Sequence, residues 1–196
     1  MKIFKKDEIS DELYLKTWEL DNITFDDSNK ISKEKALEWF YASNKRIIIA
    51  YDEEKEEVMG YLFYFLLKPS FSSKYINTAK SFHKINSRDF LTKNDKVTDI
   101  YIFSTVIQEA YQDKKIGKIP LFKILNNEFL IDILEVLNNG IKINYVYGEA
   151  VTKHGEKYLE SLDMKPCFHY ENDCKYVRKF ALDMFKKCTN YGELIK

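Results

Sequence analysis

The hydrophobic pattern of the chain begins with two segments of helical period. Residues 10–21 start at Ser10, a residue type that suits a helix N-cap, and carry a partial apolar face. Residues 31–43 form a denser apolar stripe at spacings of three and four. The polar segment TFDDSN, residues 24–29, joins them. We therefore expect two helices joined by a polar loop.

Two β patterns follow these helices. Residues 45–52 and 58–67 are rich in β-branched and aromatic side chains, and the charged segment DEEKEE separates them. This arrangement predicts a hairpin of two buried strands. Residues 99–107 predict a central strand, because the two sets of alternating positions are both largely apolar. One predicted face holds Tyr101, Phe103, Thr105 and Ile107, and the other holds Ile102, Ser104 and Val106.

The second half of the chain alternates between the two periods. Residues 116–138 predict a long helix with Pro120 in its first turn and Gly140 just after its end. A strand over 142–151, a helix over 151–164 and a hairpin over 167–183 that turns near 172–173 complete the pattern. Residues 68–98 show no period that assigns a structure, so we interpret them as an insertion.

The order of these elements predicts an α/β fold with a central mixed, mostly antiparallel sheet flanked by helices. A strand, helix, strand unit within an otherwise antiparallel arrangement gives such a sheet. With 196 residues, 45% of them hydrophobic, the chain is long enough to bury one core. We expect a single domain over residues 1–196 that carries the insertion at about 68–98.

Composition and charge exclude several classes of protein. The chain has 31 Lys and Arg against 31 Asp and Glu, with a pI near 6.8, whereas dedicated DNA-binding domains are more basic. A weaker alternative assigns nucleic-acid binding to the basic insertion, with a steep salt dependence as its signature. No apolar run reaches the roughly 20 residues of a membrane helix, and no signal peptide is evident. We expect a soluble, cytoplasmic protein.

The cysteines and histidines do not predict a metal site. Cys167, Cys174 and Cys188 form no CxxC pair, and the three histidines have no spacing typical of metal ligands. Neither a disulfide scaffold nor structural zinc is expected.

One loop carries a recognisable motif. The stretch AYQDKKIGKIP, residues 110–120, lies between the central strand and the long helix. It resembles the motif of the GNAT superfamily of acyl-CoA-dependent N-acyltransferases, which reads Gln or Arg, two residues, Gly, one residue, then Gly or Ala. Gln112 and Gly117 match, while Lys115 replaces the usual glycine. Alternatively, the stretch is only a strand-to-helix turn that carries three lysines.

The resemblance implies a binding site for the CoA pyrophosphate. Successive backbone N–H groups at a helix N-terminus form a cradle for phosphate, aided by the helix dipole. The implied residues are Gln112, Asp113, Lys114, Lys115, Ile116, Gly117 and Lys118. The lysines could supply charge to the phosphates.

A second stretch, EAVTKHGEKYLESLDMKP, resembles the end of the GNAT pattern. In that pattern Asn precedes a small residue, followed by Tyr and then Leu-Gly-Phe. Here Thr152 stands at the Asn position, Gly155 at the small one and Leu159 at the Tyr, while Asp163 replaces the Gly and Met164 the Phe. Asp tolerates the left-handed conformation better than most residues.

For the chemistry, the resemblance implies direct attack of an amine on the thioester of acetyl-CoA, or another acyl-CoA, as cosubstrate. Such attack needs a donor to the thioester oxygen, a base and an acid. The resemblance implies a sheet whose fourth and fifth strands splay apart, and it places the donor on the main chain at the end of the fourth strand, here the predicted central strand. That means the neighbourhood of Ile107 and Gln108, which would also bind pantetheine. Glu149 is the preferred base, with Asp99 and Tyr101 as other candidates. Tyr158 is the nearest phenol for the acid, but it lies one residue from the family's tyrosine position, so core, solvent and site all remain open for its side chain. Thr152 joins the CoA-binding set.

The acceptor is predicted only in outline. Asp26 and Asp27 lie in the loop that borders the acceptor cleft of this fold, and their carboxylates could hold a cationic amine. The acceptor would then be a small-molecule or peptide amine, such as a polyamine, an aminoglycoside-like compound or a lysine-bearing peptide. Turn formation alone would also explain both aspartates.

A different class of function remains open. The replacements at Lys115, Thr152 and Leu159 favour a non-catalytic GNAT-like module that binds CoA or a protein partner. Neither a membrane nor nucleic acid is an expected partner, and a homodimer is left open.

Overall fold

The computed structural model describes residues 1–71, 84–112, 115–116, 118–170 and 173–190. They form a seven-stranded sheet in the order β1-β2-β3-β4-β7-β9-β8. Its strands are β1 (Lys2–Lys5), β2 (Ile47–Asp52), β3 (Glu57–Leu67), β4 (Val97–Ile107), β7 (Lys142–Ala150), β8 (Lys165–Tyr170) and β9 (Asp173–Lys179). Neighbouring strands are antiparallel except for the parallel pair of β4 and β7. The predicted mixed, mostly antiparallel sheet is confirmed.

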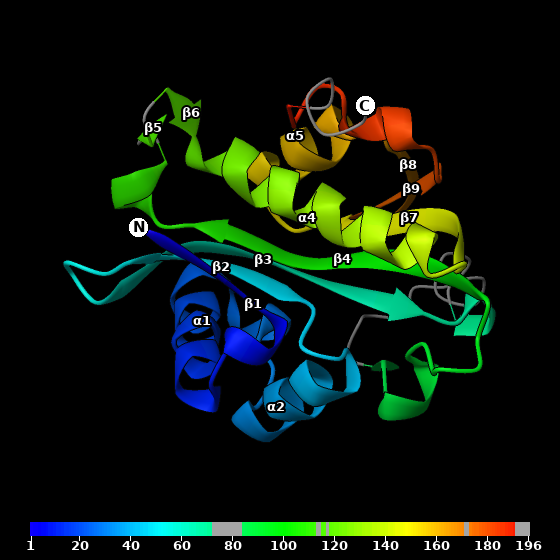
Figure 1. Cartoon of the computed structure of the whole chain (residues 1–196), viewed down its shortest axis with the longest axis horizontal. Coiled ribbons are helices and arrows are strands. Elements are labelled where there is room, and N and C mark those ends of the chain that lie inside the picture. The colour runs from blue at the N-terminus through cyan, green and yellow to red at the C-terminus, as the bar shows by residue number, and fades with distance from the viewer. Residues whose placement is uncertain (72–83, 113–114, 117, 171–172, 191–196) are drawn as a thin grey trace.

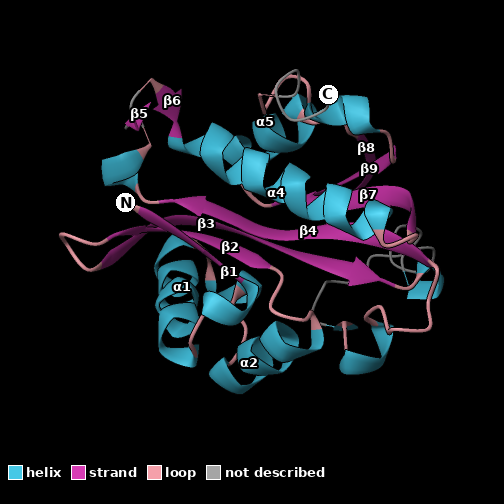
Figure 2. Ribbon diagram, in the orientation of Figure 1, coloured by secondary structure: helices cyan, strands magenta, loops and turns pink. Residues whose placement is uncertain are grey.

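Helices cover both faces of the sheet. In Figure 1, α1 (Asp11–Thr24) and α2 (Lys33–Ala42) lie below it, and α4 (Leu121–Asn138) and α5 (Lys153–Ser161) lie above it. Figure 2 shows the strands as the middle layer between these helices. Two buried apolar clusters correspond to the two faces, one containing Trp39 and Phe65 and the other containing Leu125 and Phe129. Burial on both faces explains the nearly continuous apolar sequence of β3 and β4.

The predicted helix ends at Ser10 and Gly140 are confirmed at atomic detail. The hydroxyl of Ser10 accepts a hydrogen bond from the Leu13 N–H, and Ser32 caps α2 in the same way. Gly140 has a φ of 75° directly after the C-cap of α4, a backbone conformation that favours glycine. Its N–H bonds to the carbonyl of Leu137, and the next N–H bonds to the carbonyl of Val136, which is a Schellman motif.

The start of the long helix differs from the prediction. α4 begins at Leu121, whereas the sequence pattern placed the start at Ile116. A small antiparallel pair of β5 (Lys115–Ile116) and β6 (Ile119–Pro120) occupies the intervening residues. Pro120 is the N-cap and has an extended backbone, with φ −60° and ψ 142°. Apolar side chains in this short pair fit the helical period by coincidence, so the period did not reveal the boundary.

Two further segments form elements that the sequence pattern did not predict. β1 was not predicted, because four residues with the sequence KIFK give too little alternation, yet it pairs with β2 from Lys2↔Tyr51 to Lys5↔Ile48. In the predicted insertion, a 3-10 helix at Ser87–Asp89 and a bridge between Leu67 and Phe90 are described. Residues 72–83 of the insertion lie outside the described part of the chain.

Candidate active site

The site begins where β4 and β7 separate. Their parallel pairing runs as far as Ile102↔Gly148, and the remaining residues of the two strands are not paired with each other. β4 stays paired with β3 as far as Ile107, while β7 stays paired with β9 as far as Ala150. The two strands therefore diverge at one end of the sheet, as the fold class predicted. Divergence leaves main-chain groups of β4 without a strand neighbour on the side of β7.

A β-bulge in β4 lies at this point of divergence. Ser104 pairs with Phe63 while Ile102 pairs with Tyr64, so Phe103 is the extra residue of β4. The bulge shifts the alternation: Val106 packs in the cluster below the sheet, and Ile107 packs against the cluster above it. The predicted common face of Tyr101, Phe103, Thr105 and Ile107 is therefore wrong after Phe103. A bulge of one residue exchanges the faces of every later position.

A cavity of about 650 Å³ occupies the divergence. Its lining combines residues from both faces of the sheet. From below come Trp18, Asp21, Phe25, Ile31, Phe103 and Ser104, and from above come Thr105, Ile107, Phe122, Thr152, Tyr158 and Leu159. Gln112 and Glu149 also line it. The cavity thus reaches through the sheet, and its volume lies in the range typical of small-molecule sites.

Asp21 supplies a carboxylate to the lower part of the cavity. Its Oδ1 accepts hydrogen bonds from the Tyr61 hydroxyl and from the Ser104 hydroxyl, the latter at 2.9 Å. Burial raises the pKa of Asp21 to about 6, although both hydrogen bonds oppose that rise. A carboxyl group in a cavity with a pKa near neutrality is a candidate general base.

Sequence reasoning missed Asp21. A signal was nevertheless present, because Asp21 lies four residues after Thr17 and seven after Tyr14, on the buried side of α1 that these two residues define. An acidic side chain in register with a buried stripe is unusual, and its position points to function.

Tyr158 lines the upper part of the cavity, as its assignment as the acid requires. The sequence left its direction open between core, solvent and site. Its side chain is buried, and its hydroxyl donates to Oδ1 of Asn126 at 3.1 Å. Burial, with the nearby Cys188, raises the pKa of Tyr158 well above its ordinary value, so the phenol stays protonated. The Thr105 hydroxyl lies close enough to Tyr158 to oppose this rise in pKa. Its oxygen is buried and has no partner at hydrogen-bond distance among the described residues.

Leu159, at the position of the family's tyrosine, packs instead against Gly148. A Cβ on Gly148 would lie 2.7 Å from a methyl carbon of Leu159. The glycine therefore lets α5 lie close to β7 and fixes the orientation of Tyr158 one residue earlier.

The other predicted acid–base residues differ in their surroundings. Glu149 lines the cavity, and Lys175 lies directly opposite it across the β7–β9 pair, where oppositely charged side chains attract. Tyr101 is buried and also lines the cavity. Asp99 is buried outside the described lining, and its Oδ1 accepts a hydrogen bond from the Tyr145 N–H. The structure thus brings Glu149, Tyr101 and Tyr158 together, but not Asp99.

Main-chain groups at the end of β4 are directed to both sides. The Gln108 N–H donates to the Met59 carbonyl on β3, and the Gln108 side chain donates to the Val58 carbonyl. Because N–H directions alternate along a strand, the Ile107 N–H is directed away from β3 toward the divergence. Of the two predicted donors, Ile107 is therefore the one that faces the cavity.

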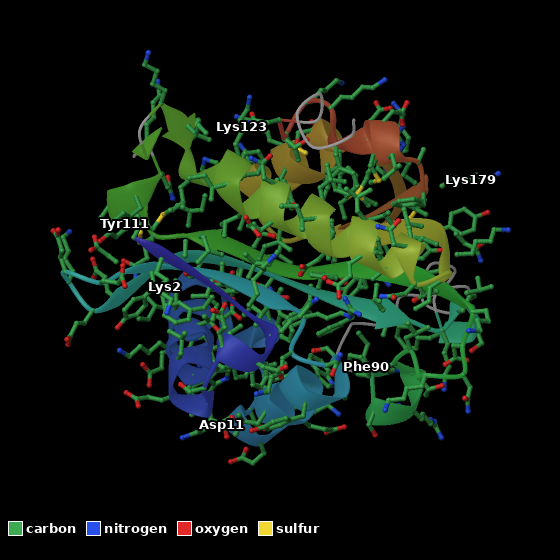
Figure 3. The ribbon with its side chains drawn as sticks, viewed as in Figure 1. Lys2, Asp11, Phe90, Tyr111, Lys123 and Lys179 are labelled. Atoms are coloured by element: carbon green, nitrogen blue, oxygen red, sulfur yellow. The ribbon has the colours of Figure 1, made fainter. Side chains whose placement is uncertain are left out.

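The motif loop is anchored at its start. Figure 3 shows Tyr111 beside the turn between β2 and β3, and its hydroxyl donates to Asp52 at 3.0 Å and also to Glu57. Gln112 lines the cavity, and its amide bonds to the Ile107 carbonyl at 3.4 Å.

Beyond Gln112, Lys115 and Lys118 are exposed cations before α4. The N-cap residue of α4, Pro120, supplies no side-chain acceptor to the N–H groups of the first turn. Asp113, Lys114 and Gly117, and the side chain of Ile116, lie outside the described part of the structure.

The second motif has structural roles. Thr152 caps α5, because its hydroxyl accepts a hydrogen bond from the Gly155 N–H at 3.0 Å, and it also lines the cavity. Asp163 has a φ of 58°, which confirms the left-handed conformation expected at that position.

The loop between α1 and α2 borders the cavity through residues other than the predicted pair. Asp26 and Asp27 are exposed and do not belong to the described lining. Asp27 forms an ion pair with Lys30 at 2.7 Å, which lowers the pKa of Asp27. Asn22, Phe25, Asn29 and Ile31 line the cavity from this segment.

Neither a metal-binding cluster nor a membrane-spanning helix is present within the described ranges. No group of three or more His, Cys, Asp or Glu side chains is arranged to hold a metal ion there. The helices of that part of the chain also include none whose length and apolar character would span a membrane.

Comparisons with known proteins identify the fold. No family model matches the sequence, and no curated protein matches it. Among solved structures, the NatC complex bound to Gag peptide and CoA contains a chain with a TM-score of 0.58 and 13% identity, over 92% of this chain and 100% of that one. The structure of Arabidopsis thaliana NAA60 in complex with acetyl-CoA has a TM-score of 0.53 and 12% identity, over 91% of this chain and 98% of that one. The structure of mosquito arylalkylamine N-acetyltransferase like 5b has a TM-score of 0.52 and 10% identity, over 91% of this chain and 100% of that one. The chain therefore has the GNAT fold.

Proposed function

We propose that the protein transfers an acetyl group from acetyl-CoA to a primary amine by direct attack. The observation that carries this proposal is the cavity through the sheet, which has the Asp21 carboxylate on one side and the protonated Tyr158 phenol on the other. A base and an acid on opposite sides of a reacting centre are what direct transfer requires. The fold of the CoA-bound and acetyl-CoA-bound neighbours supports the same conclusion.

Asp21, Ile107 and Tyr158 each act on a different atom in this reaction. Asp21 accepts a proton from the attacking nitrogen as the nitrogen forms its bond to the thioester carbon. The Ile107 N–H donates to the carbonyl oxygen while negative charge develops there. Tyr158 donates its proton to sulfur as the carbon–sulfur bond breaks. Exchange of one proton with water restores each residue, so the net reaction moves one proton from the amine to sulfur.

Binding of acetyl-CoA is supported by the upper part of the cavity. The diverging strands provide main-chain groups for the pantetheine amides, and Phe122 extends the lining to the first turn of α4. Lys115 and Lys118 are available to neutralise phosphate charge. The N-terminus of α4, where Pro120 offers no side-chain acceptor, adds the favourable helix dipole. We thus assign the CoA phosphates to this loop. Gln112 and Thr152, which line the cavity, are assigned to the wall that binds CoA.

Paired measurements of binding and turnover test the proposal. Acetyl-CoA affinity is measured by calorimetry, and CoA release is measured with a panel of primary amines. Replacing Asp21→Asn should lower kcat/KM by about 10²–10⁴-fold and leave acetyl-CoA affinity unchanged. The matched control is Asp27→Asn, which alters an exposed carboxylate of the adjoining loop and should leave both quantities unchanged.

Each contrary result has a distinct meaning. Absence of acetyl-CoA binding would refute the proposal. Tight binding without CoA release for any amine would favour the non-catalytic module instead. Full activity in the Asp21→Asn variant would remove Asp21 from the reaction and leave Glu149 as the carboxylate that lines the same cavity.

A further inference from the structure

We infer that the acceptor is a primary amine attached to an aromatic or branched apolar group, whose nitrogen binds Asp21. This inference rests on the proposed function and specifies its substrate class. It concerns the lower part of the cavity, below the sheet and next to α1, which the acetyl-CoA site above the sheet leaves for the second substrate.

The wall of this part is largely apolar and partly exposed, with Asn22 and Asn29 among its polar members. Trp18, Phe25, Ile31 and Phe103 line it, and none of these four is fully buried. Aromatic surface that remains accessible inside a concave site is stabilised when an apolar ligand covers it. The fold therefore offers the acceptor an apolar surface rather than a polar channel.

Hydrogen bonds hold these walls in place. The Trp18 indole N–H donates to the Ile31 carbonyl at 2.9 Å, which joins α1 to the segment before α2. The Phe25 N–H donates to the Asp21 carbonyl at 2.9 Å, which places Phe25 one helical turn after the carboxylate. An amine on Asp21 would thus extend its carbon body along a preformed apolar wall.

The charges of this part fit one ammonium group and no more. Among the described residues that line it from α1 and the following loop, Asp21 is the acidic one and Lys30 the basic one. A polyamine needs several carboxylates at intervals, whereas here Asp26 and Asp27 are exposed and outside the lining, and Asp27 is paired with Lys30. The polyamine and aminoglycoside-like acceptors that Asp26 and Asp27 suggested are therefore disfavoured.

A panel of four acceptors tests this inference. The probes are 2-phenylethylamine, spermidine, and two short peptide amides that begin with Phe and with Ser. Initial rates of CoA release should give the apolar members at least tenfold higher kcat/KM than spermidine and the Ser peptide. The two sources of apolar amine, small molecule and peptide N-terminus, are distinguished by which of the first and third probes reacts faster. Higher kcat/KM for spermidine, or equal values for all four, would overturn the inference.

Variants separate this inference from the proposed function. Phe25→Ala should raise the KM for the preferred amine about tenfold and leave acetyl-CoA affinity unchanged. Tyr41→Ala, which alters an exposed aromatic residue on α2 outside the lining, is the control. Should acetyl-CoA fail to bind, the proposed function fails, and calorimetric binding of 2-phenylethylamine to wild type and Asp21→Asn still decides the acceptor class. Equal binding of 2-phenylethylamine to wild type and Asp21→Asn would refute the inference that the acceptor nitrogen binds Asp21.

Discussion

The Ser104 hydroxyl donates a hydrogen bond to Oδ1 of Asp21 at 2.9 Å, and this contact depends on the bulge in β4. Without the bulge, regular alternation along β4 would place Ser104 on the opposite face of the sheet. The bulge therefore joins two elements distant in sequence, α1 and β4, at the point where β4 leaves β7. It couples the geometry of the sheet to the protonation of the carboxylate that we propose as the base.

The rate of amine acetylation should rise with pH through the pKa of Asp21, about 6, because only the ionised carboxylate can accept a proton. Replacing Ser104→Ala removes a hydrogen bond that lowers this pKa, so the rising limb of kcat/KM should move to higher pH. The measurement is kcat/KM between pH 5 and 8 for both proteins. A limb that stays in place, or moves to lower pH, would contradict the role of Ser104.

Asp21→Asn should stabilise the protein at neutral pH. The folded-state pKa is raised from 3.8 to about 6, so the unfolded chain ionises this group first and wild-type stability falls as pH rises through that window. Above pH 6 the full loss of folding stability from ionising the buried Asp21 is present, and this loss amounts to about 1–3 kcal/mol at roughly 1.4 kcal/mol per pKa unit. The Asn variant, which can accept the same two hydrogen bonds, avoids the cost.

Denaturant unfolding of both proteins at pH 4 and pH 7.5 measures this difference. The free energy of unfolding of the variant should exceed that of wild type at pH 7.5 and approach it at pH 4, where Asp21 is largely protonated in the folded state. A variant that is less stable than wild type at pH 7.5 would show that the ionised carboxylate is stabilising.

Tyr158→Phe should lower kcat by about 10–100-fold while acetyl-CoA affinity stays the same, because the phenol acts on the leaving sulfur. The matched control is Tyr64→Phe. Tyr64 is also buried, and its hydroxyl donates to Asp132 and accepts a hydrogen bond from Arg46, but it does not line the cavity. Both variants should lose about 1–2 kcal/mol of stability through an unpaired buried acceptor. Equal kcat values for the two variants would remove Tyr158 from the chemistry.

Gly148→Ala should destabilise the protein by about 1–3 kcal/mol through crowding against Leu159. A double-mutant cycle with Leu159→Ala checks this cause, since removing the leucine methyl groups creates room for the new Cβ. The combined loss should be smaller than the sum of the two single losses. Additive losses would mean that the close packing of α5 on β7 does not depend on Gly148.

Much of the fold was predictable because its elements are strongly patterned. The hairpin of β2 and β3, the strand β4 and the capped end of α4 at Gly140 each follow from local spacing and are confirmed. β1 was missed because it is too short to show a period, and its stability comes from pairing with β2. The first turn of α4 was misplaced because Ile119 and Pro120 fit both a helix and a strand.

The site was less predictable for a physical reason. The role that the sequence implied for Ile107 fits the observed geometry, because a main-chain donor depends only on the position of the strand. Asp21 was missed, and Asp26 and Asp27 were preferred, because the choice among nearby carboxylates depends on which face of α1 packs on the bulged strand. The bulge is not encoded in a local pattern, and the helical spacing of Asp21 from Tyr14 and Thr17 points to the cavity only once that face of α1 is known to be buried.

Hydrogen–deuterium exchange with and without saturating acetyl-CoA tests the central claim most directly, that the diverging strands form the acyl-donor site. The Ile107 N–H is directed away from β3 and should be protected by the ligand, together with the peptides that contain residues 103–107 and the first turn of α4. Peptides from α2, on the far side of the core, should exchange as before. Protection confined to other segments, or none at saturating ligand, would contradict the claim.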